Sequence, residues 1–170
     1  MNKPFVAILM GSDSDLPIME TAFTELKSLD IPFEAHILSV HRTPETTINF
    51  VKKVEKWGCT VFIAAAGFAA HLAGIVAAHT IKPVIGVPMA AGSLGGLDAL
   101  LSTVQMPGGI PVACTSIGKP GAKNAALLAA QIISIGDPSV AKKLQEKRIT
   151  DQANLRKADE KFQISLCKHG

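Results

Sequence analysis

Short apolar runs along the chain are each followed by a polar or glycine-rich loop and then by a segment in which apolar residues recur every three or four positions. The apolar runs fall at residues 5–10, 33–39, 60–65, 84–87 and 111–116. A brief apolar run that ends in turn residues and leads into a helix is typical of a strand in a parallel sheet with helices on both faces. The order therefore predicts an α/β fold with a five-stranded parallel sheet.

Capping and breaking residues mark the expected helix boundaries. The first helix has Asp15 as its N-cap and Pro17 in its first turn. The second has Thr43 as its cap and Pro44 at its first position, and it stops at Gly58. The expected helices span residues 16–29, 44–57, 71–79, 97–104 and 122–135.

The apolar positions of these helices predict which faces are buried. In the second helix, Phe50, Val51, Val54 and Trp57 recur at helical spacing, and we expect all four to point inward. The helix at residues 122–135 is apolar almost all round. A helix without a polar face must be covered by other parts of the structure.

The composition changes after Gly136, Asp137 and Pro138, where a charged segment begins that extends to about Cys167. Its pattern predicts one or two amphipathic helices. We interpret residues 1–137 as one domain and residues 138–170 as a C-terminal helical arm of the same domain.

Composition and charge exclude several classes of protein. The cysteines Cys59, Cys114 and Cys167 are odd in number and form no metal-binding or disulfide pattern, which indicates reduced thiols in a cytoplasmic protein and no metal site. The first apolar run is too short for a signal peptide, and no run reaches the roughly 18 apolar residues of a membrane span. The net charge is +3, and many basic residues lie among acidic ones near the C-terminus, so we expect no nucleic-acid partner.

Residues with chemical potential follow the first three predicted strands, at residues 11–15, 39–44 and 66–71. In an open parallel sheet, ligands bind outside the carboxyl ends of the strands. The first loop combines Gly11 with Ser12 and Ser14 before a helix N-terminus, which suits a phosphate. The alternative is that this loop only caps the helix.

The second loop gives a more specific signal, because His41 and Arg42 are adjacent in a short turn before a helix. Arg42 is the only arginine before residue 148. A guanidinium holds a phosphate through two parallel hydrogen bonds, while an imidazole transfers protons near neutral pH.

In the third loop, His71 either satisfies backbone groups at a helix start or lines the site. We expect structural or exposed roles for His36, His79 and His169. Lys119 and Lys123 either face a phosphate or, like most loop lysines, are solvated.

Several segments together resemble the class I 5-(carboxyamino)imidazole ribonucleotide mutases. These are Gly-Ser-Asp-Ser-Asp at 11–15, Ser-Val-His-Arg-Thr-Pro at 39–44, Ala-Ala-His-Leu at 69–72, residues 104–107 with 109–112, and residues 124–131. The match covers roughly residues 5–138. Five motifs in the family's order are far more specific than any one of them.

The resemblance implies a three-layer, flavodoxin-like domain and an isomerase of de novo purine (IMP) biosynthesis that needs no metal or organic cofactor. The reaction moves a carboxylate from the exocyclic nitrogen of an imidazole ribonucleotide to the adjacent ring carbon. The family's catalytic histidine falls on His41, and its substrate-binding residues fall on Ser12, Asp15 and Arg42. Further binding candidates in the same loops are Ser14, Ser39, Gly67 and His71. The resemblance also implies a homo-octamer and a pathway partner, the synthase that makes the substrate.

The sequence departs from the family's commonest pattern in the third loop and near residue 108. Ala65, Phe68 and Ala73 stand where glycine, glycine and proline are usual, and Gly108 stands in place of a frequent arginine. Phe68 is the most consequential, because a bulky ring at a glycine site changes the loop's backbone freedom or its contacts.

Three other functions fit the predicted architecture less well. A flavin or nicotinamide protein lacks support, because the chain has no tyrosine, one tryptophan and no G-x-G-x-x-G motif. A signalling receiver needs an aspartate after the third strand, where this chain has Ala65, Ala66 and Gly67. The sister enzymes that carboxylate aminoimidazole ribonucleotide directly typically have a lysine where Arg42 stands, so Arg42 favours the mutase.

Overall fold

Continuous apolar runs form the central strands of a parallel sheet in the computed structural model, which describes residues 4–167. The strands are β1 (Phe5–Met10), β2 (Phe33–Ile37), β3 (Cys59–Ala66), β4 (Val84–Pro88) and β5 (Ala113–Cys114). They pair in parallel in the order β2-β1-β3-β4-β5, which is the flavodoxin-like order. The prediction of an α/β fold with a five-stranded parallel sheet is confirmed.

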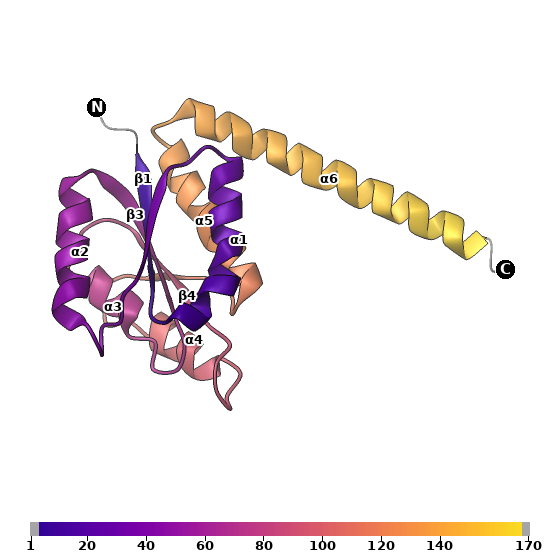
Figure 1. Ribbon diagram of the computed structural model, residues 1–170. Coiled ribbons are helices and arrows are strands. Elements are labelled where there is room, and N and C mark those ends of the chain that lie inside the picture. The colour runs from indigo at the N-terminus through magenta and orange to yellow at the C-terminus, as the bar shows by residue number, and fades with distance from the viewer. Residues whose placement is uncertain (1–3, 168–170) are drawn as a thin grey trace.

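Helices cover both faces of this sheet (Figure 1). On one face, α1 (Leu16–Ser28) and α5 (Lys119–Ser134) enclose a core that includes alternate residues of β1 and β3. On the other face, α2 (Pro44–Lys56) and α3 (Leu72–Ala77) enclose a second core. The central strands are therefore buried on both sides, which explains why their sequences are apolar without alternation.

The fourth helix, α4 (Leu97–Val104), lies on the same face as α3. Gly86 of β4 makes this packing possible, because a Cβ at this position would lie 2.2 Å from a methyl carbon of Thr103 and 3.3 Å from Ala73. The small residue lets two helices approach the sheet closely.

Three details of the predicted elements are wrong. The helix expected at residues 122–135 is α5 and begins at Lys119, so Lys119 and Lys123 lie in its first turns and not in a loop. The last strand contains only two residues, because only Ala113 and Cys114 pair with β4 at this edge of the sheet. Trp57 is 46 % exposed instead of buried. It is the C-cap residue of α2, directly before the turn at Gly58, and Lys53 Nζ lies 4.3 Å from the centre of its ring.

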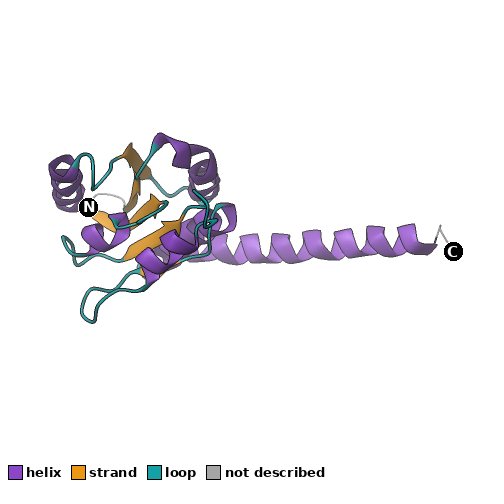
Figure 2. Ribbon diagram, turned by 90° about the horizontal axis from the view of Figure 1, so that it is seen from below, coloured by secondary structure: helices purple, strands orange, loops and turns teal. Residues whose placement is uncertain are grey.

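The C-terminal segment forms one helix, α6 (Pro138–Cys167), which projects away from the sheet (Figures 1 and 2). Its first turns are attached to α1 and the turn after it. Lys143 pairs with Asp30, and Lys147 Nζ lies 3.2 Å from Oε1 of the buried Glu25. From residue 151 to residue 166, every residue of the helix is exposed. The arm therefore has a fixed root and a free outer half within this chain.

The cysteines match the expectation of free thiols as far as the structure describes them. Cys59 is buried at the start of β3, and Cys114 is half-buried in β5. The side chain of Cys167 and the whole of His169 lie outside the described residues. Within residues 4–167, no helix has the length and apolar character needed to cross a membrane.

Candidate active site

A cavity of about 470 Å³ opens at the carboxyl ends of β1, β2 and β3. These three strands are neighbours in the sheet, so the loops that follow them meet at one edge. Eight of the residues that the sequence predicts for the site line this cavity. They are Ser12, Ser14, Asp15, Ser39, His41, Arg42, Gly67 and His71.

The loop after β1 is held by a reciprocal capping arrangement at the 3₁₀ turn η1 (Asp13–Asp15). Ser14 N donates to Ser12 Oγ at 3.3 Å, and Ser12 N donates to Asp15 Oδ2 at 3.0 Å. Asp15 precedes α1 as predicted, but its side chain makes no capping bond to that helix. The loop therefore caps its own 3₁₀ turn and not α1, the helix that the capping alternative had expected it to cap, and Ser12, Ser14 and Asp15 also border the cavity.

The two aspartates of this loop differ in their electrostatics. Asp15 is only 6 % exposed, and burial raises the pKa of its carboxyl, against the lowering effect of hydrogen bonds from the Ser12 and Gly11 N–H groups. Asp13 is exposed, and the hydrogen bond from the Ser12 hydroxyl, with one from Ser14 N, lowers its pKa. One carboxylate is thus buried at the edge of the site, while the other faces water.

The loop after β2 is closed by Thr43 and Ser39. Thr43 N donates to Ser39 O at 2.7 Å, and Ser39 N donates to Thr43 Oγ1 at 3.2 Å. Thr43 is at the N-cap position of α2 as expected, but its hydroxyl makes no capping bond to the helix. The hydroxyl instead holds the tight turn that presents His41 and Arg42.

Arg42 links the first two loops. Its Nη2 donates to the backbone oxygen of Gly11 at 2.9 Å, and its backbone N donates to Ser39 Oγ at 3.3 Å. A single hydrogen bond leaves most of the guanidinium donors available to an anion. The side chain is exposed and borders the cavity, so it can contact a ligand there.

The imidazoles of His41 and His71 form a hydrogen-bonded pair across the second and third loops. His41 Nε2 lies 2.9 Å from His71 Nδ1, and the ring planes meet at 82°. Because a hydrogen bond needs one donor and one acceptor, the two rings fix each other's tautomer. His71 is at the N-cap position of α3 without a capping bond, so its ring serves the site rather than the helix end.

The third loop contributes Gly67 and Phe68. A Cβ at Gly67 would lie 2.9 Å from the Cβ of Ala91, so only glycine fits there without movement. Phe68 has a φ of +54° and its side chain is largely exposed. Phe68 and Ala91 line the cavity, although the sequence did not assign either one to the site. Ala91 follows β4 and has a side chain without polar atoms, so the sequence carried no signal for it.

Other candidates from the sequence lie elsewhere. Lys119 and Lys123 do not line the cavity, and Lys123 Nζ lies 4.0 Å from Oε2 of Glu25. His36 bonds to Glu34, and His79 Nδ1 bonds to the backbone oxygen of Ile75, which agrees with their expected structural roles. Among the described residues, no three His, Cys, Asp or Glu side chains are grouped to hold a metal ion.

Comparison with known proteins connects this site to a family. Residues 5–154 match the model of the family described as AIR carboxylase. An N5-carboxyaminoimidazole ribonucleotide mutase of Bacillus subtilis is 50 % identical over 159 residues, which cover 93 % of this chain and 98 % of that protein. A mutase of the same name from Pyrococcus horikoshii is 54 % identical over 143 residues, covering 84 % of this chain and 80 % of the relative.

A solved structure shows the same fold. The crystal structure of Treponema denticola PurE superimposes with a TM-score of 0.84 at 33 % identity, covering 93 % of this chain and 98 % of that one. The family match includes all the loops that line the cavity. The chain therefore belongs to the AIR carboxylase family.

Proposed function

We propose that the chain is a 5-(carboxyamino)imidazole ribonucleotide mutase of purine biosynthesis. The observation that carries this proposal is the convergence of His41, Arg42 and His71 on one cavity that opens beside a helix N-terminus. The names of the two relatives at 50 % and 54 % identity support it. The reaction converts 5-carboxyamino-1-(5-phosphoribosyl)imidazole to 5-amino-1-(5-phosphoribosyl)imidazole-4-carboxylate, and the enzyme is an isomerase.

The nucleotide is held by the first two loops. Ser12, Ser14, Arg42 and the amides at the start of α1 bind the phosphate, and Ser39 supports them by fixing the Arg42 backbone. The hydroxyls of Ser12 and Ser14 lie 2.9 Å apart, so both can turn toward one phosphate. Arginine and helix N-termini are preferred phosphate ligands. Asp15 binds the ribose hydroxyls.

The reaction is a transfer in which atoms and protons balance without a cofactor. The bond between the exocyclic nitrogen and the carboxylate carbon breaks, carbon dioxide leaves, and the nitrogen takes a proton. The neighbouring ring carbon then attacks the carbon dioxide and releases its own proton. Because substrate and product are isomers, one acid–base group can give the first proton and take the second.

His41 is the group that transfers this proton. Its imidazole borders the cavity and is oriented by the hydrogen bond to His71, and a histidine can act as acid and as base near neutral pH. Gly67 lets the β3–α3 loop approach Ala91 of the β4–α4 loop closely at the edge of the cavity. The close approach excludes water, which keeps the carbon dioxide near the ring carbon that must capture it.

The oligomeric state and the cellular location are part of the same proposal. We infer a cytoplasmic homo-octamer in which residues 138–170 form an arm of the flavodoxin-like domain at 1–137 and contact neighbouring subunits. Exposed apolar side chains on the arm support this inference, among them Leu155, Phe162 and Leu166. The synthase that makes the substrate is the pathway partner. Light scattering of the purified protein tests the assembly, and a monomer would reject the octamer.

A direct conversion assay tests the activity. Purified protein is mixed with 5-(carboxyamino)imidazole ribonucleotide, and formation of the carbon-carboxylated isomer is followed. A parallel reaction contains aminoimidazole ribonucleotide and bicarbonate. Product in the first reaction alone supports the mutase, whereas product only in the second identifies a carboxylase and rejects the proposal.

A His41→Asn variant tests the role of the imidazole. It keeps a polar side chain of similar shape, so nucleotide binding is retained, while turnover falls by about 10²- to 10⁴-fold if His41 transfers the proton. Near-normal turnover would assign the proton transfer to another group, with His71 the next candidate.

A further inference from the structure

Two loops at the cavity fit into each other through two reciprocal contacts. Gly67 in the β3–α3 loop leaves the space that Ala91 fills, because a Cβ on Gly67 would lie 2.9 Å from the Ala91 Cβ. Gly92 in the β4–α4 loop leaves the space that Phe68 fills, because a Cβ on Gly92 would lie 2.6 Å from Cε1 of the ring. Each loop thus supplies one glycine and one side chain to the contact.

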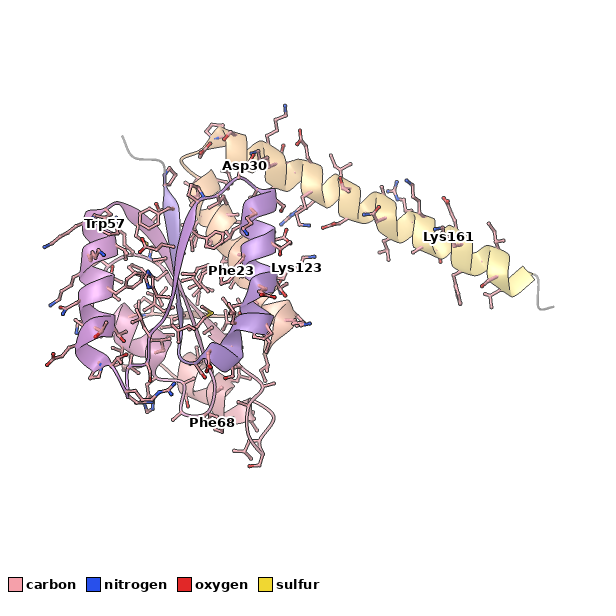
Figure 3. The ribbon with its side chains drawn as sticks, in the orientation of Figure 1. Phe23, Asp30, Trp57, Phe68, Lys123 and Lys161 are labelled. Carbon is pink, nitrogen blue, oxygen red and sulfur yellow. The ribbon has the colours of Figure 1, made fainter. Side chains whose placement is uncertain are left out.

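The contact is maintained although the backbone of Phe68 is strained. Its φ of +54° lies in the left-handed region, where a bulky residue is strained. Strained residues persist where the surroundings hold them, and they concentrate at functional sites. Phe68 does not contribute to the core, because its side chain is 60 % exposed. In Figure 3 it lies at the end of the domain opposite Trp57.

The position of the contact relates it to the reaction. Phe68, Gly67 and Ala91 all line the cavity that contains His41 and His71. The proposed reaction passes through free carbon dioxide and aminoimidazole ribonucleotide, both of which are lost if the loops separate before the ring carbon attacks. Phe68 stands where the family's commonest residue is glycine, so its ring adds a contact that keeps the two loops together during this interval.

We propose that Phe68 is a positioning residue that holds the β3–α3 and β4–α4 loops together over the cavity and so retains the decarboxylated intermediate. The inference rests on the proposed mutase function. Phe68 takes no part in proton transfer, and its ring acts by packing on Gly92. Its effect is on the partition between recapture of carbon dioxide and release of aminoimidazole ribonucleotide.

The test measures this partition. 5-(Carboxyamino)imidazole ribonucleotide is supplied to the full-length protein, and the aminoimidazole ribonucleotide released per molecule of carboxylated product is quantified, after correction for decarboxylation without enzyme. In Phe68→Gly, which relieves the strain but removes the ring, the ratio rises about three- to tenfold, because the van der Waals packing of the ring on Gly92 is lost. Phe68→Leu gives a smaller rise, because an apolar side chain remains.

A matched control separates the ring from the backbone strain. Asp30 also has a positive φ, of +53°, and it does not line the cavity. Asp30→Gly relieves the same kind of strain far from the reaction and also removes the ion pair with Lys143, which does not border the cavity, so its release ratio equals that of the wild type. A rise in this variant as large as in Phe68→Gly would overturn the inference.

A double-mutant cycle with Gly92 tests the contact itself. Gly92→Ala introduces a methyl group against the Phe68 ring and raises the release ratio in the wild-type background. In the Phe68→Gly background the methyl group meets no ring, so the same substitution has a smaller effect. The strain of alanine at φ +67° is present in both backgrounds and cancels in the comparison.

The outcomes distinguish the inference from the function on which it rests. If the wild type forms no product, the mutase proposal fails and the role of Phe68 fails with it. If the wild type forms product but folded Phe68 variants release no more intermediate than it does, only the role of Phe68 is overturned. Phe68→Leu and Gly92→Ala keep the test decisive if Phe68→Gly does not fold.

Discussion

His71 is predicted to orient the imidazole of His41 without transferring a proton itself. Its Nδ1 lies 2.9 Å from His41 Nε2, and the rings meet nearly at right angles. His71→Ala removes this hydrogen bond. His71→Asn keeps a polar atom close to the position of Nδ1 and is the conservative comparison. His36→Ala is the matched control, because His36 is also exposed but lies on β2 away from the cavity.

The expected magnitude follows from a single hydrogen bond between two imidazoles. Such a bond contributes about 0.5–1.5 kcal/mol, and about 1.4 kcal/mol corresponds to a tenfold change in rate. His71→Ala therefore lowers kcat about two- to tenfold, far less than the roughly 10²- to 10⁴-fold loss expected for His41→Asn. KM changes little, because the phosphate ligands lie on the first two loops. His71→Asn recovers part of the loss in kcat.

Steady-state kinetics of the conversion reaction provide the assay, with kcat and KM determined separately. A combined His41→Asn/His71→Ala variant completes the cycle. If His71 works only through His41, the combined variant is no slower than His41→Asn alone, because groups that act as a unit are not additive.

Two results would refute this explanation. One is a loss of kcat in His71→Ala as large as in His41→Asn, which would mean that His71 transfers a proton directly. The other is a combined variant whose loss is the product of the two single losses, which would mean that the residues act independently.

Three further predictions concern stability. Burial raises the pKa of the Asp15 carboxyl, so the wild type loses stability as the pH rises through that pKa. Asp15→Asn should therefore melt at a higher temperature than the wild type at pH 7, and the difference in melting temperature should disappear below the ordinary carboxyl pKa of 3.8. The same variant should have lower activity. Lys147→Met leaves the buried Glu25 carboxylate without its closest cation and should cost about 1.5–3 kcal/mol in denaturant unfolding, whereas the exposed Lys142→Met should cost less than about 0.5 kcal/mol. Gly121→Ala places a methyl carbon 1.6 Å from a backbone oxygen and should cost about 3 kcal/mol or more, measured in the same way; a normal unfolding midpoint would contradict the close approach at this glycine.

Much of the site could be predicted from the sequence because parallel strands bring their carboxyl ends to one edge of a sheet. Once the runs at residues 5–10, 33–39 and 60–65 were interpreted as neighbouring strands, the loops after them had to meet. The expected boundaries of these strands agree with β1, β2 and β3 to within two residues. The register of the sheet then places the candidate residues on the same cavity.

The contacts within the site could not be predicted, because they depend on loop geometry. The His41–His71 hydrogen bond joins residues 30 positions apart, and the Arg42 bond to Gly11 joins residues 31 apart. Neither pair has a sequence signature. The prediction that Trp57 is buried was wrong for a related reason. Helical spacing predicts which face of a helix a residue lies on, but not whether another element packs against the last turn of that helix.

Because α6 is anchored through its first turns, a small rotation there produces a large displacement at its far end. Its 30 residues give a length of about 45 Å at 1.5 Å per residue. A rotation of about 10° at the root would therefore move the tip by about 8 Å. The ion pairs of Lys143 with Asp30 and Lys147 with Glu25 lie within the first ten residues of the helix, so their geometry decides where its far end points. Substitutions at these few positions would redirect the whole arm while leaving the cavity and its chemistry intact.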